Sequence, residues 1–242
     1  MVWRYVCLGS VDKLVASITF AHRVTLLLVR SLILLTVAAL LCTAGWFAHQ
    51  WYTTNNKPPL SSPSAAVMAD PTVDEAPIPR AAIDNYRVPA THPRYISIPA
   101  LNVTKARVVA VGLTKGNALD TPRSISDTAW YTKSAYPGQG DGTVLIDGHN
   151  GGISRNGIFF NLDKLKSGDE ITIERGDGKQ FKYAVVENRT ETLKDANATG
   201  MTRLLTPYDP TKEGLGLVTC AGNWVPSKHV FDKRILVRAV AE

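Results

Sequence analysis

The hydrophobic and polar positions along the chain divide it into three parts, and the first is a long apolar segment. Residues 31–48 (SLILLTVAALLCTAGWFA) contain no charged residue, and the apolar run VTLLLV precedes Arg30. A helix needs about 20 apolar residues to cross the hydrocarbon core of a bilayer, and an arginine near its end can extend toward the interface. The pattern therefore predicts one transmembrane helix over residues 25–48.

The second part, residues 49–92, is rich in Pro, Ser and Ala, as in NNKPPLSSPSAAVMADPTVDEAPIPR. A segment of this composition buries too little apolar surface to offset the entropy lost when a chain becomes ordered. It therefore predicts a flexible linker that holds a domain away from a membrane.

The third part, residues 93–242, consists of short β-branched runs separated by Gly, Asp and Pro. The predicted strands are RYISIPAL (94–101), ARVVAVGL (106–113), GTVLIDGH (142–149), LGLVTC (215–220) and RILVRAV (234–240). EITIERGDGKQFKYAVVEN (170–188) predicts a hairpin that turns at Gly-Asp-Gly. Helical signals are weak, with single turns at 158–165 and 201–208. This pattern is typical of one mainly antiparallel β-barrel or sandwich.

Charge sets the expected orientation of the apolar segment. Four basic residues precede it, whereas only Lys57 follows it before residue 80; the four are Arg4, Lys13, Arg23 and Arg30. The positive-inside rule then places residues 1–24 in the cytoplasm and the β-rich domain outside the cell, in a single-pass protein of the cell membrane. Trp46, Trp51 and Tyr52 would form an aromatic belt at the outer interface.

A cleaved signal peptide is the alternative interpretation of the N-terminus. The 30 residues before the uncharged core are long for the first part of a signal peptide, and no clear A-x-A site follows. The formal net charge of +6 favours an anionic surface, but no compact basic patch with interleaved aromatic residues is present. Nucleic acid is therefore not an expected partner.

The chain has three cysteines, Cys7, Cys42 and Cys220. In the predicted topology Cys220 is the only one outside the cell, so it has no partner for an intramolecular disulfide on its own side. Such a thiol is either buried and inert or kept for its reactivity.

Three residues at strand ends suggest the reactive alternative. His149 ends GTVLIDGH, Cys220 ends LGLVTC, and Arg234 begins RILVRAV. A cysteine is mostly protonated at neutral pH and needs a nearby imidazole or cation to become a nucleophile. A guanidinium can stabilise the negative oxygen that forms when a thiolate attacks an amide, and a histidine can protonate the departing amine.

These residues and their flanks resemble the sortases, membrane-anchored cysteine transpeptidases of bacterial surfaces. The resemblance covers residues 93–242 and rests on IPAL, GTVLIDGHN, NGIFFNLDKLKSGDEITI, LVTC and DKRILVRA in that order. It implies an eight-stranded sortase-type β-barrel with short helices, in which His149, Cys220 and Arg234 are catalytic and Arg238 is not. It also implies that Thr219 contacts substrate and that the loop 188–214 selects it.

The implied reaction is a two-step acyl transfer that needs no cofactor. Cys220 would cleave the Thr–Gly bond of an LPxTG-like sorting signal on a surface protein, and the thioacyl-enzyme would pass to an amine on a cell-wall precursor or another protein. The chain departs from the family pattern at two positions. Gly216 stands where a threonine is usual, and Asp147 stands where a small residue usually precedes Gly-His. Asp147 shares a strand face with His149 and could orient the imidazole, or it could be an ordinary solvated carboxylate.

Two other functions fit parts of the pattern. One is a cell-wall cysteine peptidase, although papain-like enzymes place the cysteine before the histidine and at a helix start. The other is a membrane-tethered, non-catalytic β-barrel that binds a surface ligand and buries Cys220. Calcium could bind acidic residues, but no calcium-loop spacing is present and we expect no metal site; the candidates are Asp163, Asp169, Glu170 and Glu187.

Overall fold

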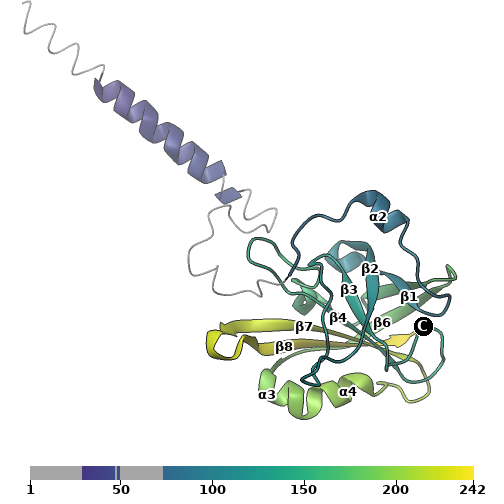
Figure 1. The fold of residues 1–242 in the computed structure, drawn as a ribbon. Coiled ribbons are helices and arrows are strands. Elements are labelled where there is room, and N and C mark those ends of the chain that lie inside the picture. Colours follow the sequence, from purple (N-terminus) through teal and green to yellow (C-terminus); the bar gives the residue numbers. More distant parts are fainter. Residues whose placement is uncertain (1–28, 47, 50–72) are drawn as a thin grey trace, which may run out of the picture. The chain divides into compact units, whose positions relative to one another are not determined.

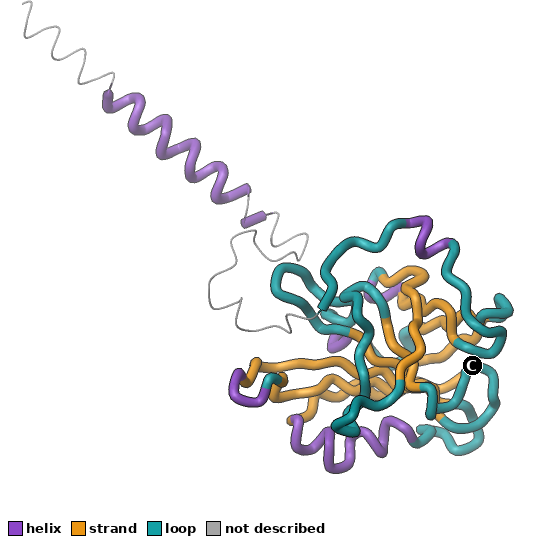
Figure 2. The backbone as a smooth tube through the Cα atoms, in the orientation of Figure 1, coloured by secondary structure: helices purple, strands orange, loops and turns teal. Residues whose placement is uncertain are grey.

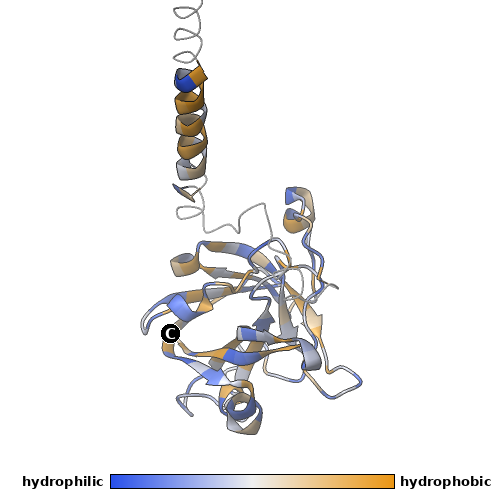
Figure 3. Cartoon of the chain, turned by 90° about the vertical axis from the view of Figure 1, so that its left-hand side faces the viewer, coloured by the Kyte–Doolittle hydropathy of each residue, from blue (hydrophilic) through white to orange (hydrophobic). Residues whose placement is uncertain are grey.

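The computed structural model describes residues 29–46, 48–49 and 73–242. The predicted cytoplasmic segment 1–24, Cys7, and the outer aromatic residues Trp51 and Tyr52 lie outside the described residues. Val29–Trp46 form one helix that is long and apolar enough to cross a membrane. Figure 3 shows apolar residues along most of this helix. The helix and the domain that follows are two separate units of the chain.

The domain is a closed barrel of eight strands in the order β1-β2-β3-β4-β7-β8-β6-β5 (Figure 1). The strands are β1 (Pro93–Ile98), β2 (Val103–Val111), β3 (Thr128–Tyr131), β4 (Thr143–Gly148), β5 (Glu170–Arg175), β6 (Gln180–Thr192), β7 (Gly214–Val225) and β8 (Val230–Ala241). Neighbouring strands are antiparallel except for β2–β3 and β4–β7, which are parallel. The structure thus confirms the predicted eight-stranded barrel and adds β3, which the hydrophobic pattern did not indicate.

Within the barrel domain, the helices that the structure describes are short, as predicted (Figure 2). The connection between β6 and β7 is helical from residue 193 to residue 205, and it comprises α3 (Leu193–Asp195), a π-helical turn (Ala196–Gly200) and α4 (Met201–Leu205). The remaining helical pieces are α2 (Arg80–Asp84) and the 3-10 turns Pro99–Leu101, Leu162–Lys164 and Pro226–Lys228. The weak helical signal at 158–165 corresponds to the turn Leu162–Lys164, and the signal at 201–208 corresponds to α4.

Strand β4 is buried on both faces, which explains its nearly continuous apolar sequence. Val144 and Ile146 point into the main core inside the barrel. Leu145 points to the opposite face, where it packs in a second apolar cluster with Leu204 of α4 and Val218 of β7. Because side chains alternate along a strand, Asp147 lies on the same face as Leu145, outside the barrel.

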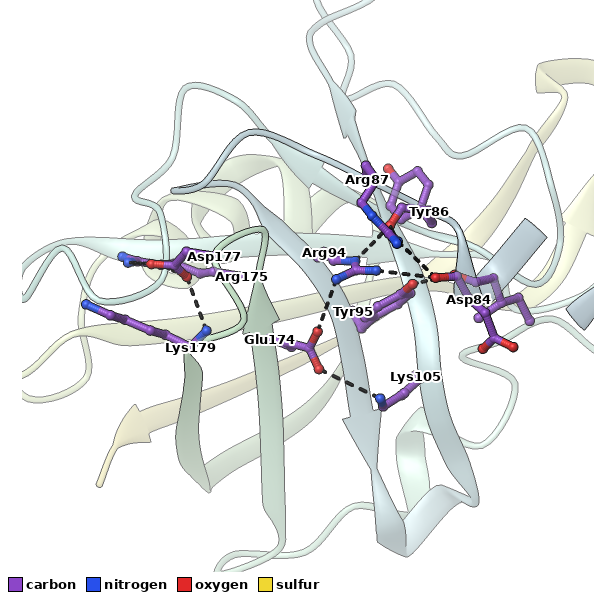
Figure 4. Close-up of polar contacts among 11 residues, drawn as sticks. Asp84, Tyr86, Arg87, Arg94, Tyr95, Lys105, Glu174, Arg175, Asp177 and Lys179 are labelled. Carbon is purple, nitrogen blue, oxygen red and sulfur yellow. Dashed lines mark hydrogen bonds and ion pairs between the residues drawn. The ribbon is translucent and has the colours of Figure 1, made fainter. Parts of the chain in front are cut away.

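The segment from Val73 to the start of β1 contacts the barrel, although its composition predicted a flexible linker. The Tyr86 hydroxyl donates a hydrogen bond to the carbonyl of Val108 on β2 at 2.8 Å. Arg94 donates to the carbonyl of Tyr86 at 2.8 Å, and the Tyr95 hydroxyl donates to the carbonyl of Ile83 (Figure 4). The last part of the expected linker is therefore ordered on the domain, while the boundaries of the domain remain a prediction.

Candidate active site

The site lies where β4, β7 and β8 run side by side. Cys220 on β7 and Arg234 on β8 are directly opposite each other in the antiparallel ladder. On the other side of β7, Asp147 of β4 is paired with Val218. Continuing that parallel register by two residues sets His149 level with Cys220. Adjacent strands are about 4.8 Å apart, so His149, which directly follows β4, lies at the level of Cys220 and Arg234. The prediction that Cys220 ends a strand and that Arg234 begins one is wrong, because β7 continues to Val225 and β8 already begins at Val230.

The side chain of Thr219 strengthens this alignment from inside the barrel. Thr219 is fully buried, and its hydroxyl donates a hydrogen bond to the carbonyl of Gly148 at 2.7 Å. Neighbouring side chains on a strand point to opposite faces, so the Cys220 side chain lies on the outer face. Thr219 does not line the pocket beside Cys220. The family resemblance implied that Thr219 contacts substrate, whereas its hydroxyl joins the middle of β7 to the end of β4.

The Arg234 guanidinium is held by the backbone of its own strand region. Its Nη1 donates to the carbonyl of Phe231 at 3.1 Å and to the carbonyl of Lys233 at 2.8 Å. A guanidinium has five N–H donors in a fixed fork, so these two contacts leave donors for a substrate. Arg238 lies further along β8. Its guanidinium is near the Glu187 carboxylate and donates a hydrogen bond to the carbonyl of Thr206 at 3.0 Å.

The His149 ring is oriented by the loop that precedes β3. Its Nε2 lies 2.5 Å from the carbonyl oxygen of Pro122. Because a carbonyl oxygen only accepts, this contact places a proton on Nε2. The backbone of His149 is fixed as well, since its carbonyl accepts from the amide of Phe159 at 3.0 Å.

A pocket of about 350 Å³ opens at this site and contains Cys220, Arg234 and Asp147 in its wall. His149 is not part of this wall. The rest of the lining is mainly apolar and includes Leu113, Leu119, Leu145, Met201, Leu205 and Val218. Asn197, Met201 and Leu205 come from the segment 188–214, so the loop expected to select substrate does contribute to the pocket.

Asp147 is the residue whose environment differs most from the sequence-based expectations. Only 8% of its surface is exposed, and Oδ2 has no hydrogen-bond partner in the described part of the chain. Burial raises the pKa of Asp147 to about 7, against the smaller opposing effects of the Gly148 backbone N–H and the Arg234 charge. It is therefore neither a solvated carboxylate nor, in this structure, hydrogen-bonded to His149, which contacts Pro122 instead.

The segment before α2 makes contacts near the site that were not predicted, because nothing in its composition indicates them. Residues 74 and 124 form a parallel β-bridge, which joins the segment before α2 to the loop that carries Pro122. The Glu75 carboxylate accepts hydrogen bonds from the amides of Ile153 and Ser154, in the turn that follows His149. The segment before α2 thus contacts the loop that carries Pro122 and the turn that follows His149.

The domain has a second pocket apart from Cys220. A larger pocket, of about 470 Å³, surrounds Glu213 and contains none of His149, Cys220 and Arg234. Within residues 29–46, 48–49 and 73–242, no group of three or more His, Cys, Asp or Glu side chains is placed to hold a metal ion. Of the acidic candidates for calcium, Glu187 lies between Arg189 and Arg203 at 3.0 and 3.3 Å.

Comparison with known proteins gives a family match. The Sortase domain model matches residues 96–242. Among solved structures, a Sortase D5 transpeptidase from Clostridium perfringens aligns at 22% identity and a TM-score of 0.44 over 62% of this chain and 79% of that one. A lid mutant of sortase A from Corynebacterium diphtheriae aligns at 26% identity and a TM-score of 0.47 over 74% and 90%. A search of curated proteins found no match.

Proposed function

The chain belongs to the sortase family of transpeptidases, and we propose that it is a cysteine transpeptidase that cleaves an LPxTG-like sorting signal and transfers the surface protein to an amine. In this proposal Cys220 is the nucleophile, His149 transfers protons and Arg234 stabilises negative charge. The observation that supports the assignment is the direct pairing of Cys220 on β7 with Arg234 on β8, with His149 immediately after the neighbouring strand β4.

The first step forms a thioester. The Cys220 thiol gives its proton to His149, and the thiolate attacks the carbonyl carbon of the scissile Thr–Gly bond. The carbonyl oxygen becomes negative, and the remaining N–H donors of Arg234 can bind it because the guanidinium is already held by Phe231 and Lys233. The C–N bond then breaks, and His149 returns its proton to the departing amine.

The second step reverses these roles. The acceptor amine attacks the thioester carbonyl, loses a proton to His149, and releases Cys220 when the C–S bond breaks. One amide bond is lost and one is made, so the reaction needs no oxidant, reductant or cofactor. If water replaces the amine, the same intermediate gives hydrolysis, which is the reaction of the peptidase alternative.

The cellular placement belongs to the same proposal. The helix Val29–Trp46 is suited to anchor the chain in a membrane. The excess of basic residues before this helix supports a cytoplasmic N-terminus and a catalytic domain outside the cell. There the enzyme would meet surface proteins that carry a sorting signal and amine acceptors of the cell wall.

The decisive experiment is to incubate the full chain in detergent with an LPxTG-type peptide, with and without an amine acceptor. We expect a covalent peptide adduct on Cys220 by mass spectrometry, and its conversion to an amine-linked product when the acceptor is added. Cys220→Ala should form neither species. Cys42→Ala is the matched control, because Cys42 lies in the apolar helix, and it should react like the wild type.

The alternatives give different results in this assay. A non-catalytic barrel would form no adduct and would not react at Cys220 with a thiol-directed vinyl sulfone. A peptidase would release the cleaved peptide at the same rate whether or not the amine is present. Either outcome would overturn the proposal of transpeptidation.

A further inference from the structure

Of the three residues in the proposed mechanism, His149 alone lies outside the strands of the barrel. Cys220 and Arg234 are paired within β7 and β8, whereas β4 ends at Gly148. Residues 150–157 (NGGISRNG), which follow the histidine, include three glycines. Glycine loses more conformational freedom on folding than any other residue, so such a turn needs contacts from elsewhere to hold one conformation. The position of the imidazole therefore depends on these contacts as well as on the sheet.

The contacts that hold the turn come from Glu75, in the segment before α2. Its carboxylate accepts hydrogen bonds from the amides of Ile153 and Ser154 and from the Ser154 hydroxyl. Its backbone carbonyl accepts from the Arg155 guanidinium at 2.6 Å. Successive backbone N–H groups form a concave site for an anion, and hydrogen bonds to a carboxylate are stronger than those to a neutral acceptor. Glu75 thus ties the turn after His149 to the segment before α2.

The neighbouring residue, Asp74, attaches the same segment to the loop that contacts the imidazole. Its amide donates to the carbonyl of Arg123 at 2.9 Å, and its carbonyl accepts from the amide of Ile125 at 2.9 Å. Pro122, directly before Arg123, accepts the hydrogen bond from the His149 ring. Two consecutive residues of one segment therefore bind both the turn that follows the histidine and the loop whose carbonyl contacts its ring.

We propose that Glu75 is a positioning residue for His149. By fixing the turn after the histidine, it keeps the imidazole where it exchanges protons with the Cys220 thiol and the substrate amine. This inference rests on the proposed function, because it takes His149 as the group that transfers protons. None of residues 73–79, all of which the structure describes, lies in the wall of the pocket that contains Cys220. Loss of the Glu75 carboxylate should therefore slow the chemistry and leave substrate binding nearly unchanged.

The expected size of the effect follows from the sensitivity of catalysis to geometry. A displacement of about 1 Å in a catalytic group can slow a reaction by about 100-fold. Glu75→Ala releases the turn only in part, because the contacts of Asp74 remain, as does the hydrogen bond from the Phe159 amide to the His149 carbonyl. We therefore expect kcat to fall by about 10- to 100-fold. KM should change by less than about twofold, since no contact with the substrate is removed.

The test measures kcat and KM of the full chain in detergent, with an LPxTG-type peptide and an amine acceptor. Each variant is assayed at a temperature at which thermal unfolding shows it to be folded. Glu75→Gln keeps one acceptor oxygen and should recover part of the kcat that Glu75→Ala loses. Tyr86→Phe is the matched control, because it removes a hydrogen bond of 2.8 Å from the same segment to the carbonyl of Val108 on β2. Since β3 separates β2 from β4, this variant should keep the wild-type kcat.

Gly152→Ala displaces the same carboxylate from the other side of the contact. A Cβ atom at Gly152 would overlap Oε1 of Glu75 and lie 2.5 Å from its Cδ, so the Glu75 side chain would have to leave the amides. We expect this variant to lower kcat much as Glu75→Ala does. In the double variant no carboxylate remains to be displaced, so Gly152→Ala should add at most about a twofold further loss. Two losses that multiply would show independent effects and would contradict the proposal.

The outcomes separate this inference from the proposed function. If the wild type forms no peptide adduct on Cys220, the proposed function fails and this inference fails with it. If the wild type reacts and Glu75→Ala keeps its kcat, only the role of Glu75 is overturned. A loss of kcat that Tyr86→Phe shares, or a rise in KM as large as the fall in kcat, would show that Glu75 stabilises the domain or the pocket instead. Should Glu75→Ala not fold, Gly152→Ala and Glu75→Gln provide the same comparison with Tyr86→Phe.

Discussion

Cys220 on β7 and Arg234 on β8 are direct partners in an antiparallel ladder, so their relative position is set by the backbone of the barrel. The guanidinium is further restrained by the carbonyls of Phe231 and Lys233. A catalytic cation held in this way does not have to be ordered when the reaction begins, and preorganised charge is usually a large contribution to catalysis. The barrel is therefore part of the proposed catalytic machinery.

Arg234→Lys tests this preorganisation. Lysine keeps the positive charge but carries a single ammonium group, so it cannot contact two backbone carbonyls and a substrate oxygen in the same fixed geometry. We expect kcat to fall by about 100-fold or more, with a smaller change in KM and little change in unfolding temperature. Lys233→Met is the matched control, because Lys233 is an exposed neighbour on the same strand, and it should react normally. Equal activity of Arg234→Lys and wild type would show that Arg234 acts as charge alone or not at all.

Gly216 departs from the family pattern, and the structure gives a physical reason. A Cβ atom at this position would lie 2.8 Å from Cγ and 2.9 Å from the carbonyl oxygen of Leu204, so only glycine allows α4 to pack so closely on β7. Gly216→Thr, which restores the usual residue, should displace α4 and lower the free energy of unfolding by about 1–3 kcal/mol. It should also weaken substrate binding, because Met201 and Leu205 line the pocket from this helix.

Urea unfolding and kcat/KM would measure the two effects of Gly216→Thr. Gly112→Ala is the control, since a Cβ atom there meets no atom within 4 Å. A Gly216→Thr variant as stable and as active as the wild type would mean that α4 moves without consequence for the pocket.

Much of the barrel could be predicted because strand alternation is a local property. Each long run of β-branched residues became a strand, and the turn at Gly178, with φ near +83°, confirms the predicted hairpin. Strand β3 was missed because its four residues, TAWY, are too few to show a period. The parallel pairing of β4 with β7 could not be predicted either, because it joins residues about 70 positions apart in the chain.

The site also has features that the sequence could predict and features that it could not. His149, Cys220 and Arg234 were chosen as the ends of predicted strands and by the family resemblance. Cys220 and Arg234 instead lie within β7 and β8, because the apolar runs that indicated the strands are shorter than the strands themselves. The environment of Asp147 did not follow, because burial depends on α4 and the β2–β3 connection, which cover the outer face of the sheet. The role of Glu75 was also hidden, since its contacts are with backbone amides far away in the chain.

Glu75 is expected to stabilise the turn after His149. Its carboxylate accepts hydrogen bonds from the amides of Ile153 and Ser154, and its own carbonyl accepts from Arg155. Glu75→Ala removes the carboxylate, which should cost about 1–3 kcal/mol of local stability and increase hydrogen exchange at these two amides. Arg80→Ala, which breaks an exposed ion pair of α2 with Asp84, should leave both exchange rates unchanged. Unchanged exchange in Glu75→Ala would show that the turn is held by its own contacts.

The pKa of Asp147 makes a prediction for the dependence of stability on pH. Burial raises the pKa of Asp147 from 3.8 to about 7 in the folded chain, while the Gly148 backbone N–H and the Arg234 charge oppose the shift. Between pH 4 and pH 7 the folded state therefore binds more protons at this position than the unfolded state, so the stabilisation is complete below about pH 4 and is lost as the pH rises through about 7. A pKa difference of about three between the folded and unfolded chain corresponds to at most about 4 kcal/mol of folding stability.

We expect the free energy of unfolding of the wild type, minus that of Asp147→Asn, to fall by up to this amount between pH 4 and pH 7, measured by urea unfolding in detergent. Asp163→Asn, an exposed carboxylate on the same chain, should give a much smaller change over this range. If the Asp147 difference stays constant or rises with pH, the carboxyl group is already ionised at low pH, and it must then have a charged or hydrogen-bonded partner in solution.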